Sequence, residues 1–150
     1  MSDTIIVATF SDTNRAYEAA NAIKKLSDQK DINFKPKAGV MLKKDDRGNL
    51  SMLESKARPL FGTAVGTTVG ALVGLIAGAP GAALGAALGA TSGLAGDAVM
   101  DALDSDFTDS VTKEMRPGMT AIIVEAEEKG TKMVDDIVTI NGGHIYRQAA

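Results

Sequence analysis

The chain has 150 residues, of which 45% are hydrophobic and 23% charged, and its 16 Lys and Arg against 19 Asp and Glu give a net charge of −3. It contains no cysteine, which excludes a disulfide framework, a thiolate nucleophile and a cysteine zinc site. Residues 1–58 carry 11 basic and 8 acidic side chains and residues 97–150 carry 5 and 11, so no basic face is concentrated in one segment and we expect no nucleic-acid partner.

The first third of the chain predicts a strand, a helix and two further strands. Its opening run, Thr4-Ile5-Ile6-Val7-Ala8-Thr9-Phe10, is apolar and β-branched, which is typical of a strand buried on both faces. Polar residues directly after this run offer N-caps for a helix. The predicted elements are, in order, a strand at 4–10, a helix from about 13 to 29, an extended segment at about 32–44, a loop at 45–49 and a short strand at 50–54.

An uncharged segment, residues 59–96, follows, and glycine recurs in it every fourth residue. This spacing places the glycines along one face of a helix, and Pro80 beside Gly81 predicts a turn between two helical arms. Each interior glycine costs about 0.5–1 kcal/mol relative to alanine, so close contact with another helix must offset the cost. We predict a glycine-zipper helical hairpin whose packing interface is formed by Gly62, Gly66, Gly70, Gly74, Gly78, Gly81, Gly85, Gly89 and Gly93.

The last third of the chain predicts two helical stretches and two strands. Asp97 opens a helical stretch, which the cluster Asp104-Ser105-Asp106 either continues or interrupts with a new N-cap, and Pro117-Gly118 ends it. The next elements are a strand within 119–127, a helix at 131–140 that ends at Gly142-Gly143, and a last strand at 144–147. The apolar run at 121–124 predicts a central strand.

Without the hairpin, the chain contains two units of strand, helix and strand, at residues 4–44 and 118–148. This order predicts an α+β fold, a ferredoxin-like sandwich, with the first strand of each unit at the sheet centre and the second at an edge. The inserted Gly/Ala-rich α-helical hairpin interrupts it. The predicted domain organisation is therefore one ferredoxin-like domain formed by residues 1–58 and 97–150, with residues 59–96 as the insertion.

Several segments together resemble one family of small bacterial proteins. They are Lys43-Lys44-Asp45-Asp46-Arg47-Gly48-Asn49-Leu50, the Gly/Ala-rich insertion, Asp104-Ser105-Asp106-Phe107, Met115-Arg116-Pro117-Gly118-Met119-Thr120-Ala121 and Asn141-Gly142-Gly143-His144. In this order they are similar to the domain-of-unknown-function 1269 family, whose members are often labelled predicted membrane proteins. The resemblance implies a membrane-linked or oligomeric, stress-associated protein, and it brings no catalytic residues with it.

Three interpretations of the hairpin remain open at this point. The leading one inserts it in a membrane as a self-associating unit, since the first arm, Leu60 to Ala79, has the length of about 30 Å that a bilayer core requires. The second buries it among copies of the chain in a soluble homo-oligomer, and the third folds it back on its own sheet. The expected partners are therefore copies of the chain and membrane lipid. The absence of a signal peptide predicts the cytoplasmic face of the inner membrane, or the cytoplasm, as the location.

No residue pattern indicates a reaction, so we expect a non-enzymatic structural or interaction protein without cofactor, metal or identified small-molecule ligand. The carboxylates of Asp97, Asp101, Asp104, Asp106 and Asp109 lack the glycine and glutamate of a calcium loop and are explained by helix capping. His144 is the only histidine, so a multi-histidine metal site is excluded. The alternative function is a ferredoxin-like small-molecule regulatory module.

Overall fold

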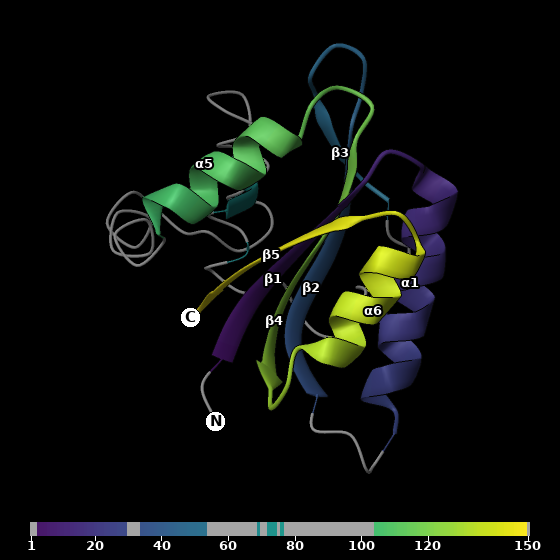
Figure 1. Ribbon diagram of the computed structural model, residues 1–150. Coiled ribbons are helices and arrows are strands. Elements are labelled where there is room, and N and C mark those ends of the chain that lie inside the picture. Colours follow the sequence, from purple (N-terminus) through teal and green to yellow (C-terminus); the bar gives the residue numbers. More distant parts are fainter. Residues whose placement is uncertain are drawn as a thin grey trace.

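The computed structural model in Figure 1 describes residues 3–29, 34–53, 69, 72–74, 76 and 104–149. Its elements alternate strands and helices much as the sequence pattern predicts. They are, in chain order, β1 (Asp3–Phe10), α1 (Thr13–Ser27), β2 (Phe34–Lys44), β3 (Leu50–Met52), α5 (Ser105–Glu114), β4 (Thr120–Glu128), α6 (Lys132–Ile140) and β5 (His144–Ala149).

The strands form one sheet in the order β3-β2-β4-β1-β5, in which every neighbouring pair is antiparallel. The two most apolar runs of the sequence lie side by side in it, because β1 pairs with β4 along its whole length, from Asp3 opposite Glu127 to Phe10 opposite Thr120. A strand with neighbours on both sides and layers on both faces must be apolar throughout. The prediction that these two strands are central is confirmed.

Helices cover both faces of the sheet, as Figure 1 shows: α1 and α6 lie side by side on one face and α5 lies on the other. Side chains alternate between the two faces along each strand. On the α5 face the sheet contributes Ile5, Val7, Val40, Leu42, Ala121 and Ile123. On the face covered by α1 and α6 it contributes Ile6, Ala8, Phe10, Met41, Ile122, Val124 and Ala126. Both sets are buried, so the molecule has two apolar cores separated by the sheet.

Two of the helices begin at aspartates that the sequence pattern offers as caps. The carboxylate of Asp12 accepts the N–H of Asn14 at 2.8 Å, and that of Asp104 accepts the N–H of Asp106 at 2.9 Å. Each bond satisfies a donor that the first helical turn leaves without a partner. A new start at Asp104, one of the two alternatives for this cluster, is therefore confirmed.

The predicted ferredoxin-like sandwich with an inserted hairpin is wrong for the described residues. Such a two-layer α+β arrangement keeps its helices on one face of the sheet, whereas here helical residues cover both faces and a fifth strand extends the sheet. β3 pairs with Leu42–Lys44, so β2, expected at an edge, has neighbours on both sides there. The physical reason is that the sheet is apolar on both faces, and an uncovered face would leave side chains such as Val7 and Val40 in water.

Part of the predicted first arm belongs to the core on the α5 face. Val69, Leu72, Val73 and Ile76 are helical, no more than 2% exposed, and packed with α5 and the sheet. The third interpretation of the hairpin, packing on its own sheet, therefore holds for these four side chains. The turn at Pro80 and the second arm lie outside the described residues, as do residues 58 and 97, so the domain boundaries there stay predictions.

Gly143 joins α6 to β5 at a place where a side chain does not fit. A Cβ built there would lie 2.5 Å from Cε1 of Phe10 and 2.9 Å from the carbonyl oxygen of Thr9. Phe10 is only 1% exposed and Thr9 is held in β1 between two strands, so neither can give way easily.

Gly143→Ala is therefore expected to lower the free energy of unfolding by about 1–3 kcal/mol through overpacking. Urea unfolding of the two proteins measures the difference. Gly130→Ala is the matched control, because nothing lies within 4 Å of a Cβ at that position. An equal effect of the two substitutions would show that the contact with Phe10 does not determine the stability of this corner.

Candidate functional site

The described residues of the first arm, 69, 72–74 and 76, are helical and present two different sides. Leu72 and Ile76 face the sheet as part of the core on the α5 face, and Gly74 lies two residues from each of them. Residues two apart are separated by about 200° around a helix axis, so Gly74 lies on the side of the helix away from the buried side chains of Leu72 and Ile76. Gly74 itself is half-buried.

Of the nine predicted interface glycines, Gly74 is the one that the described residues include. The other eight, Gly62, Gly66, Gly70, Gly78, Gly81, Gly85, Gly89 and Gly93, lie outside the described residues, as does the hairpin turn at Pro80. The structure therefore places one glycine of the stripe opposite the sheet-facing side. From the sequence, packing on the sheet was only the third interpretation, although large apolar residues at 69, 72, 73 and 76 follow the spacing of a buried helix face.

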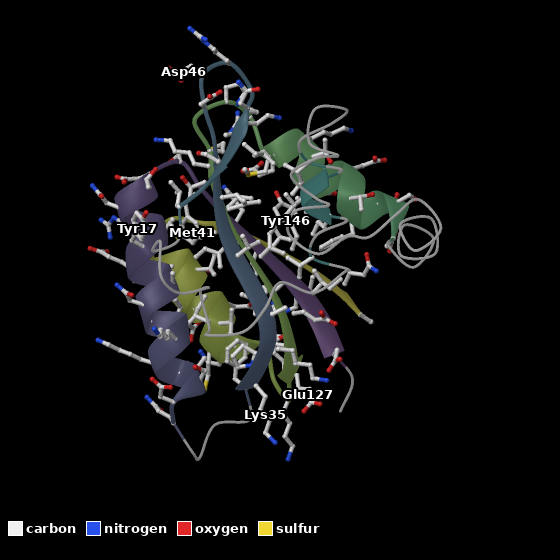
Figure 2. All side chains as sticks on the ribbon, turned by 180° about the vertical axis from the view of Figure 1, so that it is seen from behind. Tyr17, Lys35, Met41, Asp46, Glu127 and Tyr146 are labelled. Carbon is white, nitrogen blue, oxygen red and sulfur yellow. The ribbon has the colours of Figure 1, made fainter. Side chains whose placement is uncertain are left out.

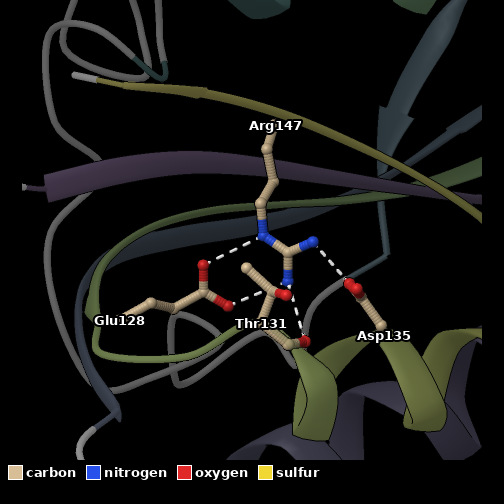
Figure 3. Close-up of polar contacts among 4 residues, drawn as sticks. All are labelled: Glu128, Thr131, Asp135 and Arg147. Atoms are coloured by element: carbon tan, nitrogen blue, oxygen red, sulfur yellow. Dashed lines mark hydrogen bonds and ion pairs between the residues drawn. The ribbon is translucent and has the colours of Figure 1, made fainter.

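Arg147 of β5 is the centre of a polar cluster that ties three elements together (Figure 3). Its guanidinium donates to both carboxylate oxygens of Glu128, at 3.0 Å and 2.9 Å, to the carboxylate of Asp135, and to the carbonyl oxygen of Thr131 at 3.3 Å. Glu128 ends β4 and Asp135 lies in the first turn of α6. The cluster therefore fastens the start of α6 to β4 and to the edge strand β5.

Burial makes this cluster more than a surface ion pair. The Arg147 side chain is 20% exposed and that of Glu128 only 4%. Burial acts to lower the pKa of Arg147, but the hydrogen bonds and charges of Glu128 and Asp135 outweigh it, and the pKa lies above its ordinary value. A bidentate contact of this kind also fixes geometry. Because its members belong to different elements and lie 12 to 19 residues from Arg147, no helix or strand periodicity could have indicated it.

A second polar cluster holds the end of α5 against the sheet. Glu114, the last residue of α5, is hydrogen-bonded to Tyr146 of β5 and accepts the hydroxyl of Thr9 in β1 at 3.5 Å. Burial and then the charge and hydrogen bond of Glu114 raise the pKa of Tyr146. Figure 2, seen from behind, labels Tyr146 on the side of the sheet that α5 covers and Tyr17 on the opposite side.

The beginning of α5 is attached to the same strand. The backbone N–H of Asp104 donates to the side-chain oxygen of Gln148 at 2.7 Å. With Glu114 bound at its other end, α5 is tied to β5 at both ends and lies over the arm residues and the sheet. This geometry explains why Val69, Leu72, Val73 and Ile76 are enclosed rather than exposed.

The residues considered for metal binding do not assemble in the described part of the chain. Asp104 caps α5, Asp106 lies in its first turn, and His144 is exposed at the start of β5. Among the described residues, no group of three His, Cys, Asp or Glu side chains is placed to hold a metal ion. Asp97 and Asp101 lie outside those residues. Within the same described ranges, no helix combines the length and the apolar character needed to span a membrane.

Comparison with known proteins identifies the family. A family model described as "Protein of unknown function (DUF1269)" matches residues 63–149, more than half of the chain. The chain belongs to the DUF1269 family. This confirms the resemblance seen in the sequence. The DUF1269 match contains the arm residues 69–76, α5 and all members of the Arg147 cluster, whereas β1, α1, β2 and β3 precede it. No curated protein and no solved structure matches the chain.

Proposed function

We propose that this DUF1269 protein is a non-enzymatic structural protein that associates with copies of itself through the glycine-bearing side of the first arm. One observation carries the proposal: Leu72 and Ile76 are buried on the sheet while Gly74 lies on the opposite side of the same helical segment. The contact with the sheet uses large side chains and needs no glycine. Glycine destabilises a helix, so its presence at every fourth residue needs an explanation. Close approach of a second helix provides one, because a glycine face lets two helix backbones come near each other.

Self-association in water agrees better with this packing than insertion in a bilayer does. Inserting the first arm would gain only about 0.3–0.6 kcal/mol for each large apolar side chain. It would also take the arm off the sheet and leave core side chains such as Val7, Val40 and Ile123 in water, at about 1.5–3 kcal/mol each. The cost exceeds the gain, so we propose the soluble homo-oligomer as the working state.

The interior polar groups support a structural role. Thr9 contacts Glu114, Thr120 shares a hydrogen bond of 3.0 Å with Thr13, and Glu128 binds Arg147. Each of these side chains is engaged in holding one element against another. A catalytic acid, base or nucleophile has to reach a substrate instead.

The test is the mass of the full chain in detergent-free buffer, measured by size-exclusion chromatography with light scattering. We expect the wild type to exceed the monomer mass of 15.5 kDa and Gly74→Leu to shift it toward that value, because a side chain there separates the two helices. Gly74→Ala should give an intermediate shift. Circular dichroism and urea unfolding verify that the sheet domain is still folded.

Gly130→Leu is the control, since this loop glycine is exposed and has open space around it. It should leave the mass of the assembly unchanged. A monomeric wild type, or a Gly74→Leu protein of wild-type mass, contradicts self-association through this side of the arm. Recovery of the wild type only from the membrane pellet with detergent contradicts the soluble state.

A further inference from the structure

A cavity of about 290 Å³ lies between the beginning of α1 and the end of α6. It is lined by Ser11, Asp12, Arg15, Ile140, Asn141 and Gly142. The two helices lie side by side on the same face of the sheet, which brings the β1–α1 turn next to the α6–β5 turn (Figure 1). The proposed self-association involves the first arm on the α5 face of the sheet, so this cavity, on the face covered by α1 and α6, is separate from that interface.

The walls of the cavity are fixed by hydrogen bonds within each turn. Asp12 caps α1 by accepting the N–H of Asn14, and the side-chain amide of Asn141 donates to the carbonyl oxygen of Ile137 at 2.8 Å. The backbone N–H of Gly142 donates to the carbonyl oxygen of Thr139 at 3.0 Å. Below them, Gly143 packs closely on the buried ring of Phe10. The site is therefore formed in advance of any ligand, which lowers the entropic cost of binding.

The cavity contains a cation suited to a carboxylate. Arg15 has a side chain that is 56% exposed, and its nitrogen lies 3.8 Å from the Glu18 carboxylate, beyond hydrogen-bond distance. Its planar fork of N–H donors matches the two oxygens of a carboxylate. The Glu18 side chain is 66% exposed, so the pair is weak and a ligand carboxylate can compete with Glu18 for Arg15.

The opposite charge and an apolar surface are also present. Asp12 supplies a carboxylate, of which the cap to Asn14 uses one oxygen, and Ser11 supplies a hydroxyl beside it. Both can accept hydrogen bonds from an ammonium group. Ile140, at the end of α6, is 76% exposed, more than Tyr17 or Met133, and forms the apolar part of the lining.

We propose that this cavity binds a free α-amino acid with a branched apolar side chain. Arg15 binds its carboxylate, Asp12 and Ser11 accept from its ammonium group, and its side chain packs on Ile140. The volume of the cavity is just below the range of about 300–1,000 Å³ that is usual for drug-sized ligands, so it suits a ligand of amino-acid size.

L-leucine is the probe, titrated into the full-length protein while backbone amide signals are followed by NMR. We expect saturable shifts at residues 11–15 and 140–142. Arg15→Gln should weaken leucine binding about tenfold, and the control Lys24→Gln, which removes an exposed cation at the other end of α1, should change it less than about twofold. Ile140→Ala should weaken leucine binding more than alanine binding.

Two leucine analogues test the assigned roles of the charges. 4-Methylpentanoate lacks the ammonium group and 3-methylbutylamine lacks the carboxylate, and each should bind about tenfold more weakly than leucine. The Arg15→Gln protein should no longer distinguish leucine from the amine. The absence of saturable shifts at residues 11–15 and 140–142, shifts confined to other residues, or equal effects of Arg15→Gln and Lys24→Gln would overturn the proposal.

Discussion

Leu72→Ala is expected to lower the free energy of unfolding by about 2–5 kcal/mol, one of the two largest effects that this structure predicts for a single substitution. Leu72 is fully buried in the core to which α5 and the sheet both contribute, and its truncation removes apolar contacts and leaves a cavity. Urea unfolding in detergent-free buffer, followed by far-UV circular dichroism, measures the loss. The same measurement tests whether the first arm is part of the core in water.

The matched control is Ile140→Ala, which removes atoms from an aliphatic side chain that is 76% exposed. It should change the free energy of unfolding by less than about 0.5 kcal/mol. If Leu72→Ala is equally neutral, the arm does not pack on the sheet in solution. In that case packing on the sheet no longer favours a soluble assembly, and insertion of the arm in a bilayer becomes the better explanation.

Arg147→Met is expected to lower the free energy of unfolding by about 2–4 kcal/mol. Methionine keeps much of the volume of the side chain but leaves Glu128, which is 4% exposed, without the cation that compensates its charge. We expect a smaller decrease in the free energy of unfolding than for a fully buried ion pair, because the Arg147 side chain is 20% exposed. Arg116→Met is the control, since Arg116 is exposed, and it should cost less than about 0.5 kcal/mol.

A double variant separates the loss of a contact from the penalty of a buried charge. Arg147→Met combined with Glu128→Leu should recover at least half of the loss, because the buried carboxylate of Glu128 is then removed and the remaining one, Asp135, has a side chain that is 37% exposed to water. Chemical denaturation of the four proteins gives the coupling free energy. Additive effects of the two substitutions would mean that Glu128 and Arg147 stabilise the fold independently, contrary to the cluster in Figure 3.

Local patterns in the sequence predict most elements of this protein correctly. The apolar runs at 4–10 and 121–124 are central strands, and Asp104 begins a helix. The turn at 45–49 connects two paired strands, because Asp45 accepts from the backbone of Arg47 and Asn49 and Gly48 adopts a positive φ of 84°. These features depend on residues close together in the chain, and short-range sterics and hydrogen bonding determine them.

The arrangement of the layers was predicted less well. The two-layer sandwich was predicted from the order of strands and helices. The central parts of β1 and β2 are apolar on both faces, which disagrees with a sheet covered on one face only. Such strands require a layer on each side. That the second layer contains α5 together with Val69, Leu72, Val73 and Ile76 depends on contacts between segments far apart in the chain.

The candidate sites could not be predicted from the sequence for the same reason, because they depend on contacts between separate segments. The stripe of glycines is visible as a period of four, yet the period does not say which side of the helix meets the sheet. The Arg147 cluster joins side chains of three elements, β4, α6 and β5. The cavity joins residues from both ends of the chain, with Arg15 on one side and Ile140 on the other. No spacing in the sequence links them.

The sequence by itself determined the strands and helices, the helix caps and the membership in the DUF1269 family, because each depends on local residue patterns or on their order. The tertiary structure decided that Leu72 and its neighbours cover the sheet, that Gly74 faces away from it, and that β2 is enclosed by β3. The physical reason is that apolar burial is not directional. An apolar helix face can be buried against lipid, against a second copy of the chain or against the sheet of the same chain. Only the folded structure shows which of these surfaces it contacts.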